Sequence, residues 1–298
     1  MNEIKIKTVM ITGASTGIGY ATTVRLLQAG FYVFPTVRTL EAAQNLTHKL
    51  DAITSNHGRH TILLLDVCNP DLIQSAKENL ENHLNGKPLD ALVNNAGVAL
   101  GGPLLEIDMN LLRTQMEVNL VGLLNVIQVF APLLGVKHRN TKGGRIINVS
   151  SISGVRAMPF VGPYTASKFA LEGLSDSLRM ELIPYGIDVI LIQPGPIKTA
   201  IWDKAPSPDE HPSIDGPYGD ALRRFHQQFI ETGKQGMHPD KIAQLIYHAL
   251  TVKNPKARYV RTPGYFTRYL LPKWLSTRTF DRFITRMLGL DPTTFHDR

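Results

Sequence analysis

Short apolar runs recur along the first two thirds of the chain, and each is followed by a polar or glycine-containing turn. Continuous apolar runs bounded by such turns are typical of strands buried on both faces of a parallel sheet. We predict six strands from this pattern, within residues 7–12, 31–38, 61–67, 88–97, 144–151 and 186–202.

Amphipathic segments separate these runs. One follows the first strand and ends at Gly30, where a glycine commonly terminates a helix; others cover 111–134 and 165–182. Alternating strands and helices favour a parallel sheet with right-handed crossovers. The pattern therefore predicts an α/β fold, a Rossmann-like doubly wound parallel sheet of about seven strands, in a single domain.

Composition supports a globular chain. Of the 298 residues 43% are hydrophobic and 19% are charged, a balance unlike that of disordered chains. The single cysteine, Cys68, excludes an internal disulfide and a cysteine-based zinc site, and His226 and His238 show no metal-ligand pairing, so we expect no metal. No signal peptide is recognised, and no stretch reaches the ~18 apolar residues of a spanning helix. We expect a cytoplasmic protein that is soluble or at most peripheral to a membrane.

The first strand leads into the glycine pattern G-A-S-T-G-I-G at 13–19. Glycines let the backbone turn sharply and approach a pyrophosphate, while the following helix supplies N–H groups and the positive end of its dipole. An ordinary strand-to-helix turn explains one glycine here better than it explains three. The predicted cofactor contacts in this turn are Gly13, Ser15, Thr16, Gly17, Ile18 and Gly19.

The end of the second strand indicates which cofactor is preferred. An acidic residue there usually binds a free ribose 2′-hydroxyl, whereas an arginine suits a 2′-phosphate. This chain has Val37 followed by Arg38, and a guanidinium pairs well with phosphate. We therefore predict NADP(H) over NAD(H); the alternative is that Arg38 is a solvated loop residue.

Residues 148–168 contain the candidate catalytic groups. Tyr164 and Lys168 are four positions apart on a predicted helix and so share one face. A nearby cation favours the phenolate and lowers the pKa of a tyrosine, which brings it closer to where proton transfer is efficient. Ser151 follows a buried strand, and its hydroxyl can bond a substrate oxygen; Ser150 is the less favoured alternative. Alone, a Y-x-x-x-K pair is more often a solvated helix face.

Together, YTASK at 164–168, the serine thirteen residues before its tyrosine and the glycine turn resemble the short-chain dehydrogenase/reductase family over roughly residues 5–200. The resemblance implies that Ser151, Tyr164 and Lys168 are catalytic, that Lys168 also holds the nicotinamide ribose with Tyr164 beside it, and that Asn119 holds a water in the proton relay. Packing alone would also explain Asn119. Further cofactor contacts implied by the resemblance are Asp66, Val67, Asn95, Ala96, Gly97, Pro194, Gly195, Ile197 and Thr199.

The remaining segments differ in character from this core, which we assign to 5–200 and 240–262. The proline-rich stretch and polar helix within 203–238 are predicted to form a substrate lid, or else a plain surface insertion. Residues 263–298 form a basic, aromatic, amphipathic extension. Such a helix can lie on an anionic membrane but more often packs on its own domain. No nucleic-acid-binding motif accompanies the net charge of +7, and an anionic cofactor accounts for some of that charge equally simply.

The sequence thus predicts an NADP(H)-dependent oxidoreductase that interconverts a hydrophobic secondary alcohol and ketone, or a primary alcohol and aldehyde. The extended C-terminus and YTASKFALEG look most like the hydroxysteroid and retinol dehydrogenase-like branch, whose substrates are steroid, retinoid or lipid-like, and relatives are usually dimers or tetramers. Two alternatives remain at this point: a cofactor-binding regulator without turnover, and a peripheral membrane protein acting through its basic tail.

Overall fold

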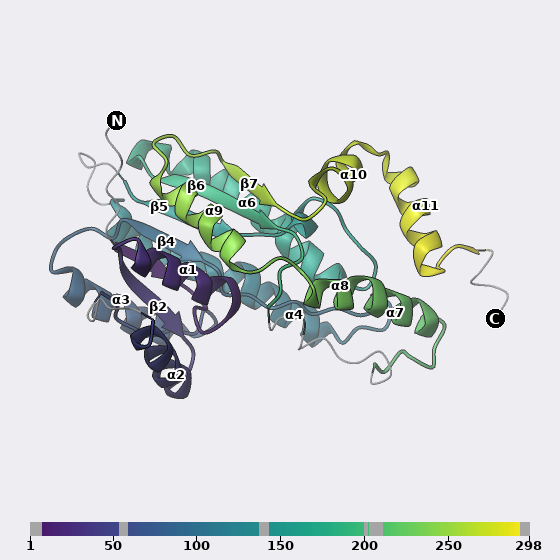
Figure 1. Cartoon of the computed structure of the whole chain (residues 1–298), viewed down its shortest axis with the longest axis horizontal. Helices are drawn as coiled ribbons and strands as arrows, with labels where there is room; N and C mark the ends of the chain where they lie inside the picture. The colour runs from purple at the N-terminus through teal and green to yellow at the C-terminus, as the bar shows by residue number, and fades with distance from the viewer. Residues whose placement is uncertain (1–7, 54–58, 137–142, 200–201, 203–210, 293–298) are drawn as a thin grey trace.

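The computed structural model describes residues 8–53, 59–136, 143–199, 202 and 211–292, and contains one seven-stranded sheet (Figure 1). Its strand order is β3-β2-β1-β4-β5-β6-β7, and every adjacent pair is parallel. The predicted doubly wound α/β fold is confirmed. The strands are β1 (Thr8–Ile11), β2 (Tyr32–Val37), β3 (Leu63–Leu64), β4 (Ala91–Asn94), β5 (Arg145–Val149), β6 (Asp188–Pro194) and β7 (Arg258–Arg261).

Helices cover both faces of the sheet, because successive strand residues point to opposite sides. In β1, Val9 and Ile11 pack in one core and Met10 in the other. The first core is closed by α1 (Gly17–Gln28), α2 (Leu40–Asp51) and α9 (Asp240–Thr251). The second is closed by α3 (Pro70–Leu84), α5 (Gly122–Phe130) and α6 (Gly162–Glu181). The helix α4 (Met109–Met116) contacts α6.

The third strand is shorter than the predicted run of 61–67. Leu63 and Leu64 form the ladder with β2 at the edge of the sheet, and His60 adds an isolated parallel bridge to Val33. The chain then turns at Asp66, whose carboxylate accepts a hydrogen bond from the Cys68 N–H at 2.9 Å and whose carbonyl accepts one from Asn69. A short polar turn therefore replaces the last residues of the expected strand.

The predicted helix at 111–134 is one continuous helical path, Met109–Leu134, with a π-helical turn at Glu117–Val121. Contrary to expectation, it has the length and composition of a membrane span, with a mean hydropathy of 1.6. It is the one such helix within the described residues. Val126 and Phe130 on this helix are fully buried in the second core. Core helices of soluble proteins have the same length and composition, so this helix is weak evidence for a membrane span.

Two further parts lie at one end of the sheet (Figure 1). The first contains α7 (Gly219–Phe225), a π-helical turn and α8 (Glu231–Lys234). The second, here called the C-terminal arm, is residues 264–292 and contains α10 (Leu271–Trp274) and α11 (Thr277–Leu288). They meet in a third apolar cluster, the lid cluster, whose buried members are Phe160, Ala221, Leu222, Phe225, Ile230, Ile284 and Leu288.

The amphipathic C-terminal helix therefore packs on its own chain. The division into core, lid and extension stays a prediction. Residues 5–7, 54–58, 137–142 and 200 of that predicted core, 203–210 of the lid and 293–298 of the extension lie outside the described residues.

Candidate active site

Buried amide side chains connect the carboxyl ends of the central strands to α6. Asn94 and Asn148 are register partners at the ends of β4 and β5, and Asn94 Nδ2 donates to Asn148 Oδ1 at 2.9 Å. Asn148 Nδ2 in turn donates to Ser175 Oγ on α6, also at 2.9 Å. Since buried amides are strongly disfavoured without partners, these contacts fix how α6 lies over the strand ends.

A second set of bonds holds the glycine turn. Asn95 Nδ2 donates to the carbonyls of Thr12 at 3.0 Å and Gly13 at 2.9 Å. The Thr12 hydroxyl accepts hydrogen bonds from the N–H groups of Asn95 and Ala96. Thr12 was not predicted as a site residue; the only sequence signal was a hydroxyl at the end of an apolar strand, directly before the glycines.

The glycine turn fits a pyrophosphate. Gly13 and Gly17 have φ values of +65° and +59°, which side chains other than glycine rarely adopt. Thr16 provides no side-chain cap at the start of α1, which leaves N–H groups of the first helical turn for an anion. A Cβ on Gly17 would lie 3.1 Å from Thr199 Cγ2, so the structure brings two predicted contacts from distant segments together.

Arg38 and Thr36 mark the cofactor end of β2. Arg38 is exposed directly after the strand and makes no hydrogen bond or ion pair with the residues that the structure describes. Thr36 Oγ1 is buried without a hydrogen-bond partner. The Asp66 carboxylate already accepts the Cys68 N–H, whereas Val67 is buried against Gly122 of α5. A guanidinium free at this edge fits a 2′-phosphate.

The remaining predicted contacts follow β6. Pro194 ends this strand, and Gly195 donates to the Arg261 carbonyl at 2.8 Å. A Cβ on Gly195 would overlap Thr262, so only glycine fits there. Ile197 is buried and forms an isolated parallel bridge with Met237, which ties this turn to the end of the predicted lid.

Ser151 and Tyr164 meet at the start of α6. The Ser151 side chain lies within hydrogen-bonding reach of the Tyr164 hydroxyl, and Ser151 Oγ accepts a hydrogen bond from the Ser153 N–H at 3.1 Å. Ser150 Oγ is buried and has no hydrogen-bond partner among the described residues. Of the two serines, the geometry therefore favours Ser151. Burial raises the pKa of Tyr164, and the bond to Ser151 lowers it in part.

Lys168 lies one helical turn further along the same face. Its Nζ donates to the Val149 carbonyl of β5 at 2.9 Å and lies 5.8 Å from the centre of the Tyr164 ring. Burial lowers the pKa of Lys168 to about 8, opposed by the nearby Glu172 carboxylate. We expected Lys168 to lower the pKa of Tyr164, but in this structure burial raises that pKa. The reason is that desolvation of the phenol outweighs other influences.

Asn119 lies on the π-helical turn and is 1% exposed. Its side chain accepts from the Val98 N–H at 2.9 Å and donates to the Val98 carbonyl and to Ser167 Oγ. Ser167 Oγ donates to the Tyr164 carbonyl at 2.7 Å. Asn119 is thus joined to the Tyr164 turn through one hydroxyl, at a helix irregularity of a kind frequent at functional sites.

Gln115, one turn before Asn119, was missed by the sequence reasoning. It is fully buried, accepts from the Leu100 N–H at 2.7 Å and donates to the Val98 carbonyl at 2.8 Å. Together the two amides hold the loop that follows Gly97 by hydrogen bonds. A Cβ added to Gly97 would lie 3.2 Å from Asn119 Oδ1, so the loop and Asn119 are closely packed. The i, i+4 spacing of two amides was the available signal.

Comparisons with known proteins identify the family of this chain. The family profile described as short chain dehydrogenase matches residues 7–210. The NADPH-dependent 3-dehydrocapnine reductase of Ornithobacterium rhinotracheale is 36% identical over 282 residues, covering 93% of this chain and 97% of the relative. Human 17-beta-hydroxysteroid dehydrogenase type 1 is 33% identical over 288 residues, covering 94% and 84%.

Among solved structures, a short-chain dehydrogenase from Streptomyces avermitilis has a TM-score of 0.72 at 25% identity, covering 95% of this chain and 96% of its own. The chain belongs to the short-chain dehydrogenase family. It is an oxidoreductase acting on CH–OH groups, and the predicted likeness to the hydroxysteroid branch is confirmed.

Gly19→Ala tests the packing of the glycine turn. A Cβ there would overlap the Gly13 carbonyl and lie 2.6 Å from Asn95 Nδ2, so we expect a loss of about 1–3 kcal/mol in the free energy of unfolding. Gly173→Ala is the matched control, because its Cβ meets no atom within 4 Å on the middle of α6. That variant should gain up to about 1 kcal/mol. Urea unfolding measures both, and equal effects would contradict the packing described.

Lys168→Met tests the buried ammonium through its pH dependence. Between a folded pKa of about 8 and the ordinary 10.5, the unfolded chain binds more protons, so this lysine makes wild-type stability rise with pH. The stability of Lys168→Met relative to wild type should therefore fall by roughly 3 kcal/mol from pH 7 to above pH 10. Urea unfolding across this range measures the difference, with Lys77→Met as a surface control. A pH-independent difference would overturn the assignment.

Proposed function

We propose that this chain is an NADP(H)-dependent oxidoreductase that interconverts a hydrophobic ketone or aldehyde with its alcohol, with Tyr164 as general acid and base. The observation that carries the proposal is the proximity of the Ser151 and Tyr164 side chains, with Lys168 on the same helix face as Tyr164 and bonded to the Val149 carbonyl of β5. This group lies at the carboxyl edge of a parallel sheet, next to the glycine turn, where ligands bind in such folds.

The chain's own groups have distinct tasks in this reaction. NADPH, when bound, supplies the hydride, and NADP⁺ accepts it in the reverse direction. The Ser151 hydroxyl binds the substrate oxygen while Tyr164 donates its proton to that oxygen. The ordinary pKa of a tyrosine already leaves the phenol protonated at neutral pH, as an acid needs to be, and burial raises the pKa of Tyr164 further. Lys168 binds the nicotinamide ribose and stabilises the phenolate left after proton transfer, and Asn119 supports the relay that returns the proton.

Arg38 is the reason to propose NADP(H) over NAD(H). It follows β2 without an acidic neighbour, since Val37 is buried at the position where an acid would bind a 2′-hydroxyl. The NADPH in the name of the Ornithobacterium relative supports the same choice. The predicted contacts of the glycine turn, Asp66, Val67, Asn95–Gly97 and 194–199 surround the same sheet edge and would hold the rest of the cofactor.

The substrate side is apolar and aromatic. Phe160, between Ser151 and Tyr164 in the chain, has a φ of +65° and stacks edge-on with Tyr218 and Phe225 of the lid cluster. Its strained backbone is held in part by a 2.7 Å bond from Gly102 N–H to its carbonyl. We therefore propose a steroid or lipid-like carbonyl as substrate, in an enzyme that assembles into a homo-oligomer in the cytoplasm.

Tyr164→Phe should abolish turnover while preserving the fold. Removing the acid and base typically costs 10²- to 10⁴-fold. The measurement is NADPH oxidation at the nicotinamide absorbance band with steroid, retinoid and long-chain 3-keto substrates. Ser150→Ala is the matched control and should retain activity, whereas Ser151→Ala should not. Turnover that survives in Tyr164→Phe would mean that another group is the catalyst, and tight NADPH binding without turnover on any carbonyl would favour a regulator.

Arg38→Asp should reverse the cofactor preference. Loss of a charge-assisted bond, with a carboxylate facing the phosphate, should lower kcat/KM for NADPH by roughly tenfold to a hundredfold and leave that for NADH equal or higher. Lys87→Asp makes the same charge change at the amino edge of the sheet and should leave the preference unchanged. Equal losses with both cofactors would show that Arg38 does not read the 2′-phosphate.

A further inference from the structure

Most of the exposed aromatic side chains among the described residues lie in the C-terminal arm. Among the described residues, the large aromatic side chains that solvent reaches most are Phe169, Tyr265, Phe266, Trp274 and Phe283. All but Phe169 belong to the C-terminal arm. Trp274 is 70% exposed, Phe283 63% and Phe266 55%. A folded domain with a complete core does not need to leave these rings in water, so their clustering indicates an interaction surface.

The same arm is strongly basic. It carries five cationic residues against two acidic ones, and none of the five forms an ion pair within the part of the chain that the structure describes. The cations are Arg268, Lys273, Arg278, Arg282 and Arg286. Unpaired cations beside exposed aromatic rings are complementary to a partner surface that carries anionic groups and has an apolar layer just beneath them.

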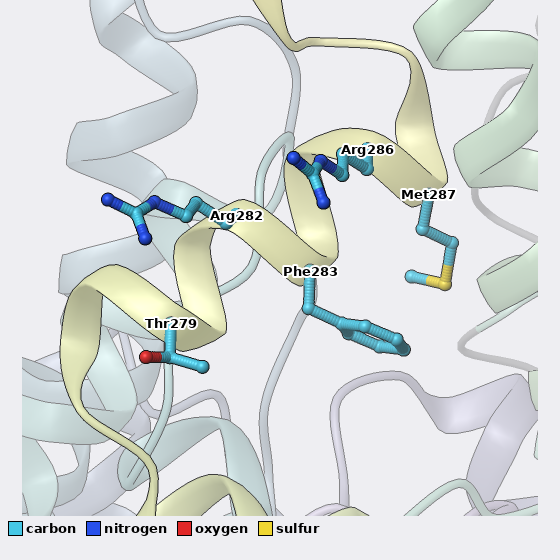
Figure 2. A pocket seen from close by; sticks show the side chains of 5 residues that line it. All are labelled: Thr279, Arg282, Phe283, Arg286 and Met287. Atoms are coloured by element: carbon cyan, nitrogen blue, oxygen red, sulfur yellow. The ribbon is translucent and has the colours of Figure 1, made fainter.

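Helix α11 presents two different faces. Its inner face buries Ile284 and Leu288 in the lid cluster. Figure 2 shows Arg282 and Arg286 extending to one side of the helix while Phe283 and Met287 point to the other; with Thr279 they line an open surface pocket. Packing on the domain and docking on a membrane are therefore not alternatives for this helix, because they use different faces.

The arm is held in a fixed position rather than hanging from the fold. Arg156, five residues after Ser151, donates to the carbonyls of Pro272 at 2.7 Å and Leu275 at 2.8 Å and lies over the Phe280 ring. The buried Tyr269 hydroxyl donates to Gln193 of β6 at 3.2 Å. These contacts fix the exposed rings and cations in space before any partner arrives, which reduces the entropy cost of docking.

We propose that the C-terminal arm is a docking surface for the interface of an anionic phospholipid bilayer. The aromatic rings of Phe266, Trp274 and Phe283 enter the headgroup region, where such side chains are favoured. The arginines and Lys273 pair with lipid phosphates. Because α11 packs on the lid cluster, docking places the lid beside the bilayer. The surface is independent of which carbonyl the enzyme reduces.

Vesicle flotation of the full-length enzyme with NADPH tests the proposal. The vesicles are phosphatidylcholine alone and phosphatidylcholine mixed with phosphatidylglycerol. Wild type should float with the mixed vesicles, weakly with the neutral ones, and less as salt rises. R282Q/R286Q should weaken binding to mixed vesicles roughly thirtyfold, and Phe266→Ser/Trp274→Ser should weaken binding to both kinds.

Lys87→Gln/Lys256→Gln is the matched control, because it removes the same charge at the opposite, amino-terminal edge of the sheet and should float like wild type. All variants should keep wild-type turnover of a water-soluble carbonyl without vesicles, which separates this test from that of the catalytic proposal. As a second readout, bromine-labelled lipids should quench Trp274 fluorescence in wild type, and the quenching should disappear in Trp274→Phe.

Three results would overturn the proposal. The first is no flotation of wild type with mixed vesicles at low salt. The second is equal, salt-insensitive binding to neutral and mixed vesicles, which would exclude the role of the arginines. The third is loss of an oligomer, measured by light scattering, in the arm variants when wild type binds no vesicle; the surface would then join two copies of this chain.

Discussion

The site depends on buried amide groups that connect the strand ends. Asn95 holds the glycine turn to β4, and Asn94, Asn148 and Ser175 join β4, β5 and α6 in one chain of hydrogen bonds. In a low-dielectric interior such bonds are strong when made and costly when missing. A shift of α6 by one turn would leave several polar atoms unpaired. These bonds therefore fix the position of α6 relative to the glycine turn, although the two segments are far apart in the sequence.

Within that frame, burial shifts the pKa values of the two groups that we propose as catalytic, Tyr164 and Lys168. Desolvation favours the neutral form of both side chains, so it raises the pKa of Tyr164 and lowers that of Lys168 to about 8. The pKa values of tyrosine and lysine are nearly equal in water, at 10.0 and 10.5, and burial moves them apart, so that the pKa of the phenol lies above that of the ammonium. Lys168 retains its proton at neutral pH while the bond to the Val149 carbonyl replaces part of its lost hydration. An ammonium group beside a phenol stabilises the phenolate, which lets the phenol both donate its proton and take one back.

Much of the fold and the site could be predicted from the sequence, since strand runs, glycine spacing and an i, i+4 pair are local patterns. What escaped prediction depends on tertiary partners. Gln115 and Thr12 act through bonds to segments distant in the chain, and no local pattern specifies those partners. β3 is short because a polar turn at Asp66 replaces pairing at the sheet edge. The direction of the Tyr164 shift was wrong because burial, unlike spacing, cannot be read from neighbouring residues.

The C-terminal arm is connected to the part of the fold where we propose that the substrate binds. Arg156 binds the arm from the segment between Ser151 and Tyr164, and Phe160, on the same segment, packs with the lid. The arm and the lid cluster are therefore both attached to the segment between Ser151 and Tyr164. The positive charge on the arm is also not needed to bind a cofactor, because the glycine turn and Arg38 belong to the other half of the sheet. An enzyme whose apolar substrate resides in a bilayer would benefit from both properties together.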